Sequence, residues 1–445
     1  MKRELTSGSV MKNLLFFSLP YLLSFFLQTL YGMADLLIIG QFGSVADTTA
    51  VSVGSQVMHM LTVMIVGLAM GATVNIGQAI GGRDNRRAAL FTGNTVTLFM
   101  GLSSVLTLLL LVLRRAIVFA VSTPADAAAG TVDYLTICFI GIPFITAYNI
   151  ISAVFRGMGD SKSPMYFIAV ACAANIALDY LFIGVLGMGP AGAALGTTLS
   201  QAVSVVISLI FVKMRKTDFA LKKADLKPDK QITGKILKIG VPVAMQDGFI
   251  QIAFMVITVI ANRRGLNDAA AVGIVEKIIG FLFLVPSSML SAVSALGAQN
   301  IGAQKPERAR KTLLYAIFIA AGFGGTVAVI MQFLSGGAVS LFTDSAAVIR
   351  LGGGYLRGYA WDCLFAGIHF AFSGYFCACG KSGISFMHNI IAILLVRLPG
   401  SYLMSSMFPE TLYPMGLATA AGSLLSALIC AAAFVIIQRK KRDIA

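Results

Sequence analysis

Long apolar runs separated by short polar stretches fill almost the whole chain. Each run is long enough for one membrane span, because a helix needs about 20 apolar residues to cross the hydrocarbon core of a bilayer. The pattern therefore predicts twelve transmembrane helices. One polar stretch, 214–235, is much longer than the other connections and divides the helices into two sets of six. The predicted spans are 14–36, 51–80, 89–113, 134–155, 164–186 and 191–213, followed by 236–261, 270–297, 310–334, 352–377, 384–407 and 414–438.

The composition supports this interpretation. Of the 445 residues, 57% are hydrophobic and 12% are charged, whereas a soluble protein carries roughly 25% charged residues. An ordinary cytoplasmic enzyme is therefore excluded. The first apolar run is too long for a signal peptide and lacks a small-residue cleavage site, so it is interpreted as the first span. We expect an all-α polytopic membrane protein with a six-helix N-terminal lobe (1–213), a cytoplasmic linker (214–235) and a six-helix C-terminal lobe (236–445).

The charges predict the orientation in the membrane. The chain has 34 Lys and Arg residues against 19 Asp and Glu, a net charge of +15. With the N-terminus inside, most basic residues fall on the cytoplasmic face, in the tails, the linker and the short loops on that side. This bias predicts that both termini are cytoplasmic and favours anionic lipid headgroups as neighbours, not nucleic acid. The basic residues predicted on the opposite face are Arg114, Arg115, Arg263, Arg264, Arg350 and Arg357.

The two halves of the chain repeat one another at an offset of about 221 residues. Pro20 in the first span corresponds to Pro242 in the seventh, and the segment that begins at Phe155 corresponds to the one that begins at Phe376. Because each half has an even number of spans, both enter the membrane in the same orientation, which makes the repeat parallel. Two such halves around a cavity are typical of alternating-access transporters. Chance likeness between two glycine-bearing helical bundles is the less favoured alternative.

Ionisable residues inside the predicted spans are the candidates for function. A charge at the bilayer centre costs about 2.5–3.5 kcal/mol even on lenient insertion scales, so each buried acid needs a functional or structural reason. Most of the acidic residues lie in loops or tails, where contact with solvent makes the free-energy cost of their charge small. The acids inside spans are Asp35, Asp179, Asp247, Glu276 and Asp362.

Two of these acids predict a cation site in the first half. Asn175 and Asp179 are four residues apart and so share one helix face, and Asp35 lies late in the first span. Carboxylate and amide oxygens can hold a proton or coordinate Na⁺, since hard cations prefer oxygen ligands. The repeat places Asp35 opposite Ile257 and Asp179 opposite Gly400, so the second half lacks this pair. The alternative is a hydrogen-bonded pair that only holds two helices together.

At this point a family resemblance becomes visible. The matching motifs are LPYLLSFFLQTLYGMADLLIIGQFG (19–43), GATVNIGQAIGGRDNRRA (71–88), FRGMGDSKSPM (155–165), NIALDYLFI (175–183), AVGIVEKIIGF (271–281) and SALGAQNIGAQKPERA (294–309). Together they resemble the multidrug and toxic compound extrusion (MATE) transporters, in the branch typical of Firmicutes. The resemblance implies twelve helices in two lobes, a V-shaped central cavity, and export of amphipathic, mostly cationic drugs coupled to H⁺ or Na⁺.

The resemblance also implies which residues bind the coupling ion. In related transporters the residues equivalent to Asp35, Asn175 and Asp179 form a cation site in the N-terminal lobe, together with an asparagine of the fourth helix. That asparagine corresponds best to Asn149 in this chain. The resemblance thus implies that Na⁺, if it is the coupling ion, binds at the first three residues, and no other metal site is expected.

The second half departs from the family pattern. The NorM-like branch places a glutamate eight residues after the proline of the seventh helix, where this chain has Ile250. This departure argues against a NorM-type Na⁺ site in the C-terminal lobe. The buried acids there either face a substrate cavity or pair with Lys277 or Arg397. The candidate cavity residues are Gln246, Asp247, Glu276 and Asp362.

Three function classes remain. A cation-coupled drug exporter fits best, and we expect it to work as a monomer in the plasma membrane, without an organic cofactor and in contact with lipids and small amphipathic substrates. The alternative is a lipid-linked saccharide flippase of the same superfamily, but twelve spans and several buried acids argue against it. An intramembrane enzyme would need a motif such as HExxH or GxSxG, and the sequence contains neither, nor a GxxxxGK[ST] loop for ATP.

Overall fold

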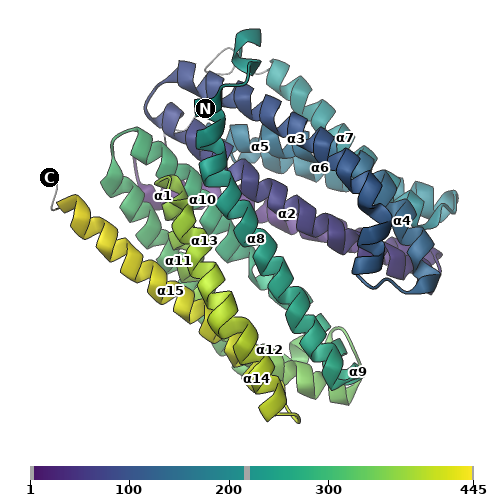
Figure 1. Cartoon of the computed structure of the whole chain (residues 1–445). Coiled ribbons are helices and arrows are strands. Elements are labelled where there is room, and N and C mark those ends of the chain that lie inside the picture. The colour runs from purple at the N-terminus through teal and green to yellow at the C-terminus, as the bar shows by residue number, and fades with distance from the viewer. Residues whose placement is uncertain (1–4, 215–220, 443–445) are drawn as a thin grey trace. The chain divides into compact units, whose positions relative to one another are not determined.

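The computed structural model describes residues 5–214 and 221–442, with side chains as far as Arg439. Residues 215–220 of the predicted linker, and Lys2 and Arg3 of the predicted cytoplasmic tail, lie outside the described residues. Helices make up nearly all of the described part (Figure 1). The expectation of an all-α membrane protein is therefore confirmed.

The helices follow the predicted order. The first half consists of α1 (Val10–Phe42), α2 (Val45–Gly81), α3 (Asn85–Ala120), α4 (Ala125–Ile140), α5 (Ile142–Gly157), α6 (Lys162–Asp179), the π-helix η1 (Tyr180–Val185) and α7 (Gly189–Met214). The short 3₁₀ helix η2 (Lys223–Leu226) comes next. The second half consists of α8 (Lys230–Arg264), α9 (Leu266–Leu282), α10 (Leu284–Gly302), α11 (Pro306–Ser340), α12 (Ala346–Ala378), α13 (Ser382–Ala392), the π-helix η3 (Ile393–Arg397), α14 (Leu398–Met407) and α15 (Tyr413–Arg442).

All twelve predicted spans lie in these helices. By length and apolar composition, 10 helices of the described chain can cross a membrane, or up to 11 if α4 and α5, which meet at 47°, form one bent span. The remaining predicted span is α12, which is long enough at 33 residues. Two polar residues of α12, Asp362 and His369, lower its mean hydropathy, and both are buried inside the protein.

The chain packs as two compact units, and their limits differ from the predicted lobe limits. One unit is Leu19–Gly240, and the other contains the residues before Leu19 together with those after Gly240. The start of α1 therefore packs with the second half, and η2 and the start of α8 pack with the first. The exchange points lie next to Pro20 and Pro242, the only prolines inside those two helices.

Hydrogen bonds to backbone carbonyls explain why the N-terminal segment belongs with the second half. Lys305 Nζ donates to the carbonyl of Thr6 at 2.9 Å, and Arg308 donates to those of Ser7 and Gly8 at 3.0 and 2.9 Å. Asn13 Nδ2 also donates to the Ser7 carbonyl at 2.9 Å, from the first turn of α1. Two cationic side chains, Lys305 before α11 and Arg308 in its first turn, thus bind this short segment to the second half.

A second polar cluster fastens η2 to α3 in the first unit. Arg86 Nη1 lies 2.5 Å from Asp225 Oδ1, and the backbone N–H of Lys222 donates to the same carboxylate at 2.9 Å. The Lys222 hydrogen bond and the Arg86 guanidinium hold the pKa of Asp225 below its usual value, although burial opposes them. Asn94 accepts from the backbone N–H of Asp229 at 2.7 Å and donates to the Asp225 carbonyl at 3.3 Å.

The first turns of α8 lie against α2 at contact distance between backbones. A Cβ at Gly71 would lie 2.1 Å from the Ile236 carbonyl oxygen, and one at Gly240 would lie 2.3 Å from that of Leu68. Only glycine permits this approach, as is common where transmembrane helices cross closely. The sequence alone suggested a linker between two lobes; the structure shows that the end of this segment is part of the first unit.

Candidate functional site

The candidate cation site lies inside the first unit, where three helices converge. Asp35 comes from α1, Asn175 and Asp179 come from the end of α6, and Thr197 comes from α7. All four side chains are buried, and Asn175 and Asp179 are completely inaccessible. The structure therefore brings together the three residues for which the sequence predicted a shared site.

The two carboxyl groups face one another. Asp35 lies next to both Asp179 and Asn175, and Thr197 Oγ1 donates to Asp35 Oδ2 at 3.1 Å. Among the described residues, the other Asp35 oxygen, both Asp179 oxygens, and the amide oxygen and nitrogen of Asn175 have no hydrogen-bond partner. Two acids in a low-dielectric interior, without an ion-pair partner, cannot both stay ionised unless a cation joins them.

This arrangement can hold one proton or one small cation. A proton shared between Asp35 and Asp179 would provide the missing donor for the pair. A Na⁺ ion would instead find carboxylate and amide oxygens, the ligands that hard cations prefer. Both options neutralise the buried negative charge, so the unsatisfied oxygens fit the predicted coupling ion.

Two local features position the site, and the sequence analysis did not find them. Asp179 is the last residue of α6 and is followed directly by the π-helix η1, an irregularity that is frequent at functional sites. On α7, a Cβ at Gly196 would lie only 2.1 Å from Asp179 Oδ1. The spacing of Gly192 and Gly196, four residues apart, is a small-residue pattern that could have indicated a close helix contact.

Asn149 remains a prediction. It lies on α5 and is buried, at 5% exposure. Its amide Nδ2 donates to the Ile145 carbonyl of its own helix at 2.8 Å. This bond leaves its side-chain oxygen as the atom that would serve a cation.

The four candidate residues of the second half lie on three helices. Gln246 and Asp247 are on α8, and Glu276 on α9 accepts from Thr258 Oγ1 at 3.1 Å. Asp362 on α12 lies 3.6 Å from Arg397 Nη2, so pairing with Arg397, the alternative to a cavity role, is what the structure shows for Asp362. A cavity of about 40 Å³ in this half is lined by Ile250, Phe254, Phe283, His369, Phe370, Asn389, Arg397 and Ser423, and by none of the four candidates.

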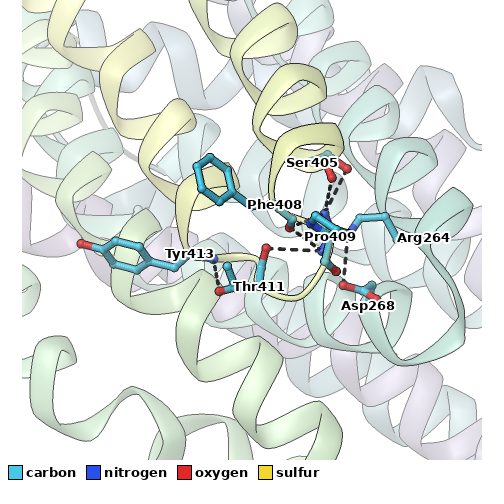
Figure 2. A network of polar contacts seen from close by, with 7 residues as sticks. All are labelled: Arg264, Asp268, Ser405, Phe408, Pro409, Thr411 and Tyr413. Carbon is cyan, nitrogen blue, oxygen red and sulfur yellow. Dashed lines mark hydrogen bonds and ion pairs between the residues drawn. The ribbon is translucent and has the colours of Figure 1, made fainter.

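A half-buried arginine forms a polar cluster at the end of α8. Arg264, the last residue of α8, forms an ion pair with Asp268 at 3.1 Å. Its guanidinium also donates to the carbonyl of Ser405, at the end of α14, and to those of Phe408, Pro409 and Thr411, between α14 and α15 (Figure 2). The sequence predicted only that Arg264 lies on the outer face, because the carbonyl groups that it binds leave no pattern in the sequence.

The fold and the site define a class of protein: a helical membrane protein of two repeated halves with an unpaired acidic pair buried inside one unit. A sequence profile of the MatE family matches residues 20–181 and 242–403, one copy in each half. The chain therefore belongs to the MatE family, and the repeat found in the sequence is the repeat of that family.

Similar proteins agree with this assignment. "Probable multidrug resistance protein YpnP" of Bacillus subtilis is 29% identical over 91% of this chain and 90% of its own length. "Multidrug export protein MepA" of Staphylococcus aureus is 26% identical over 98% of this chain and 94% of its own length. A MOP superfamily transporter from Pyrococcus furiosus, 24% identical, superposes with a TM-score of 0.89 over 96% of this chain and 95% of that one, which supports the fold.

Proposed function

We propose that this protein is an antiporter that exports amphipathic, mostly cationic drugs in exchange for H⁺ or Na⁺ by alternating access. It acts in the plasma membrane with both termini in the cytoplasm, as the distribution of basic residues favours. It needs no organic cofactor and works as a monomer among membrane lipids. The names of its relatives, a multidrug export protein and a probable multidrug resistance protein, support drugs as the exported class.

The observation that carries this proposal is the unpaired acidic pair, Asp35 and Asp179. In the proposed cycle the pair takes up the coupling cation from outside and releases it inside while drug moves outward. Binding removes a buried negative charge, which changes the relative free energies of two packings of the surrounding helices. Pro20, on the same helix as Asp35, removes one backbone hydrogen bond and provides a place for that helix to bend.

The test is dye efflux from vesicles that contain the purified full chain, driven by an imposed pH gradient or by an imposed Na⁺ gradient. Asp35→Asn keeps the shape of the side chain but cannot cycle its charge, so it should abolish efflux under both gradients. Asp179→Asn should do nearly the same. The double variant should be little worse than either single variant, as expected for two residues of one site.

Asp133→Asn is the matched control, because Asp133 is an exposed acid on α4, and this variant should export dye at the wild-type rate. Each variant must be recovered in amounts comparable to the wild type. Wild-type efflux by Asp35→Asn under either gradient would refute the site, and efflux that requires ATP would refute secondary transport altogether. The gradient that drives the wild type identifies the coupling ion.

A further inference from the structure

The second half of the chain also buries a carboxylate, but that carboxylate has a cation of its own. Asp362 is completely inaccessible, and Arg397 Nη2 lies 3.6 Å from its Oδ2. The same nitrogen donates to the Tyr359 hydroxyl at 2.5 Å. The guanidinium carbon also lies 5.1 Å from the ring centre of Phe254 and 5.7 Å from that of Tyr359. The cation is thus held by a carboxylate, a hydroxyl and two aromatic faces.

The two halves differ in how the negative charge of a buried carboxylate is compensated. A carboxylate inside a membrane is stable only when a positive charge compensates it. Arginine stays protonated under all ordinary conditions, so Asp362 is compensated permanently by a group on the same chain. Both Asp362 oxygens, like those of the acidic pair, lack a hydrogen-bond partner among the described residues, so the difference is one of charge. No cationic side chain among the described residues acts on Asp35 or Asp179, so the compensation of that pair must come from solution.

We infer that Arg397 is a tethered counter-cation that occupies the Asp362 carboxylate and thereby excludes H⁺ and Na⁺ from it. Coupling is then confined to one site, at Asp35 and Asp179. This inference rests on the proposed function for the meaning of that first site. It assigns to Arg397 a role in specificity: the residue determines how many cations the transporter binds in one cycle.

A small cavity borders the Arg397 side chain. The cavity of about 40 Å³ that its side chain borders also presents the polar side chains of His369, Asn389 and Ser423. Such a volume exceeds the roughly 10–15 Å³ that one water molecule requires. Asp362 does not line this cavity, but the Arg397 side chain lies between the two, 3.6 Å from the carboxylate. Shortening or neutralising Arg397 should therefore open the cavity toward Asp362, convert Asp362 into a second cation site and leave the surrounding helices in place. The charged and titratable groups that act on this region are Asp362, Cys363, Tyr355, Tyr359, Glu276, Lys277, His369, His388 and Arg397.

The experiment measures the melting temperature of the full chain in detergent against pH, and in NaCl against choline chloride at equal ionic strength. All variants carry Asp35→Asn and Asp179→Asn, so the first site contributes to none of them. Adding Arg397→Met should make stability depend on cations: the protein should be more stable at low pH, or in Na⁺, and lose stability as the cation is withdrawn. The dependence of stability on pH or on Na⁺ concentration should become steeper by an amount that corresponds to about one bound cation per chain.

Adding Asp362→Asn to Arg397→Met should cancel this gain. The neutral pair, Asp362→Asn with Arg397→Met, buries no charge at this position and should fold, because replacing a buried ion pair by neutral groups is often tolerated. Its slopes should equal those of the background variant, in which Asp362 and Arg397 are intact. Arg397 acts electrostatically on Glu276, so the contribution of Glu276 cancels between the two variants that both lack Arg397, and the difference between their slopes reports Asp362.

Two outcomes would overturn the inference. A background slope larger than that of the neutral pair by one cation would mean that Asp362 binds a mobile cation despite Arg397. A folded Arg397→Met variant without a new cation dependence would mean that Arg397 excludes nothing. If Arg397→Met does not fold, the comparison of the background with the neutral pair still shows whether Asp362 binds a mobile cation in the presence of Arg397. If Asp35 and Asp179 do not bind the coupling cation, the background variant, which lacks both carboxylates, should depend on pH and Na⁺ as the wild type does. This outcome is separate from those that test Arg397.

Discussion

Gly196→Ala tests the geometry of the acidic pair without removing a charge. The new Cβ would lie 2.1 Å from Asp179 Oδ1 and 3.2 Å from its Cγ. A relaxed contact between a carbon and an oxygen atom needs about 3.3–3.6 Å, so the carboxyl oxygen must move by more than about 1 Å. Overpacking of this kind costs about 1–3 kcal/mol. Because the cation-bound form needs both carboxyl groups in place, it bears the strain, and the affinity for the coupling cation should fall by about 10- to 100-fold.

The assay is gradient-driven dye efflux measured over a range of concentrations of the coupling cation. Gly196→Ala should shift the half-maximal concentration upward by about tenfold or more. Gly101→Ala on α3 is the matched control, since its Cβ would meet nothing within 4 Å, and it should leave the half-maximal concentration unchanged. A wild-type response from Gly196→Ala would refute the idea that α7 fixes the position of the Asp179 carboxyl group.

Two further predictions concern the polar clusters outside this site. Arg264→Lys should lower the free energy of unfolding by about 2 kcal/mol, because a lysine cannot reach four carbonyl groups at once; the melting temperature should fall, whereas Arg263→Lys, at an exposed neighbour, should have no effect. Asp225→Asn should melt below the wild type at neutral pH, because the lowered pKa of Asp225 stabilises the fold above the unfolded pKa. That difference should disappear as the pH falls through the folded pKa, and a gap that persists in acid would contradict the charge argument.

Much of the fold could be predicted from the sequence because the signal is local. Each span is predicted from its own apolar residues, and all twelve predicted spans fall in helices, of which 10, or up to 11, are long and apolar enough to cross a membrane in the described chain. The acidic pair was found for a similar reason: an acid inside an apolar run is conspicuous, and the spacing of Asn175 and Asp179 gives their shared face directly. Whether these residues bind the coupling ion stays a prediction until efflux is measured.

The features that escaped prediction depend on partners far apart in the chain. The sequence placed Arg397 and Asp362 in separate spans and left their pairing open, because hydropathy gives no rotation of one helix against another. Gly196 was not predicted as part of the site, because its contact with the Asp179 carboxyl group depends on how α7 packs against the end of α6. The division of the chain at Gly240, and not within the linker, results from backbone contacts that no periodic pattern records.

The exchange of helix starts between the two units has a consequence for biosynthesis. The carbonyl of Thr6 and the Lys305 side chain that binds it are 299 residues apart, so at about 5–20 residues per second the first segment waits roughly 15–60 s for its partner. The unit Leu19–Gly240, in contrast, is complete once the first turns of α8 have been made. A chain cut after Met214 would lack η2 and the turns that cover Gly71, whereas a chain cut after Gly240 would contain every residue of that unit.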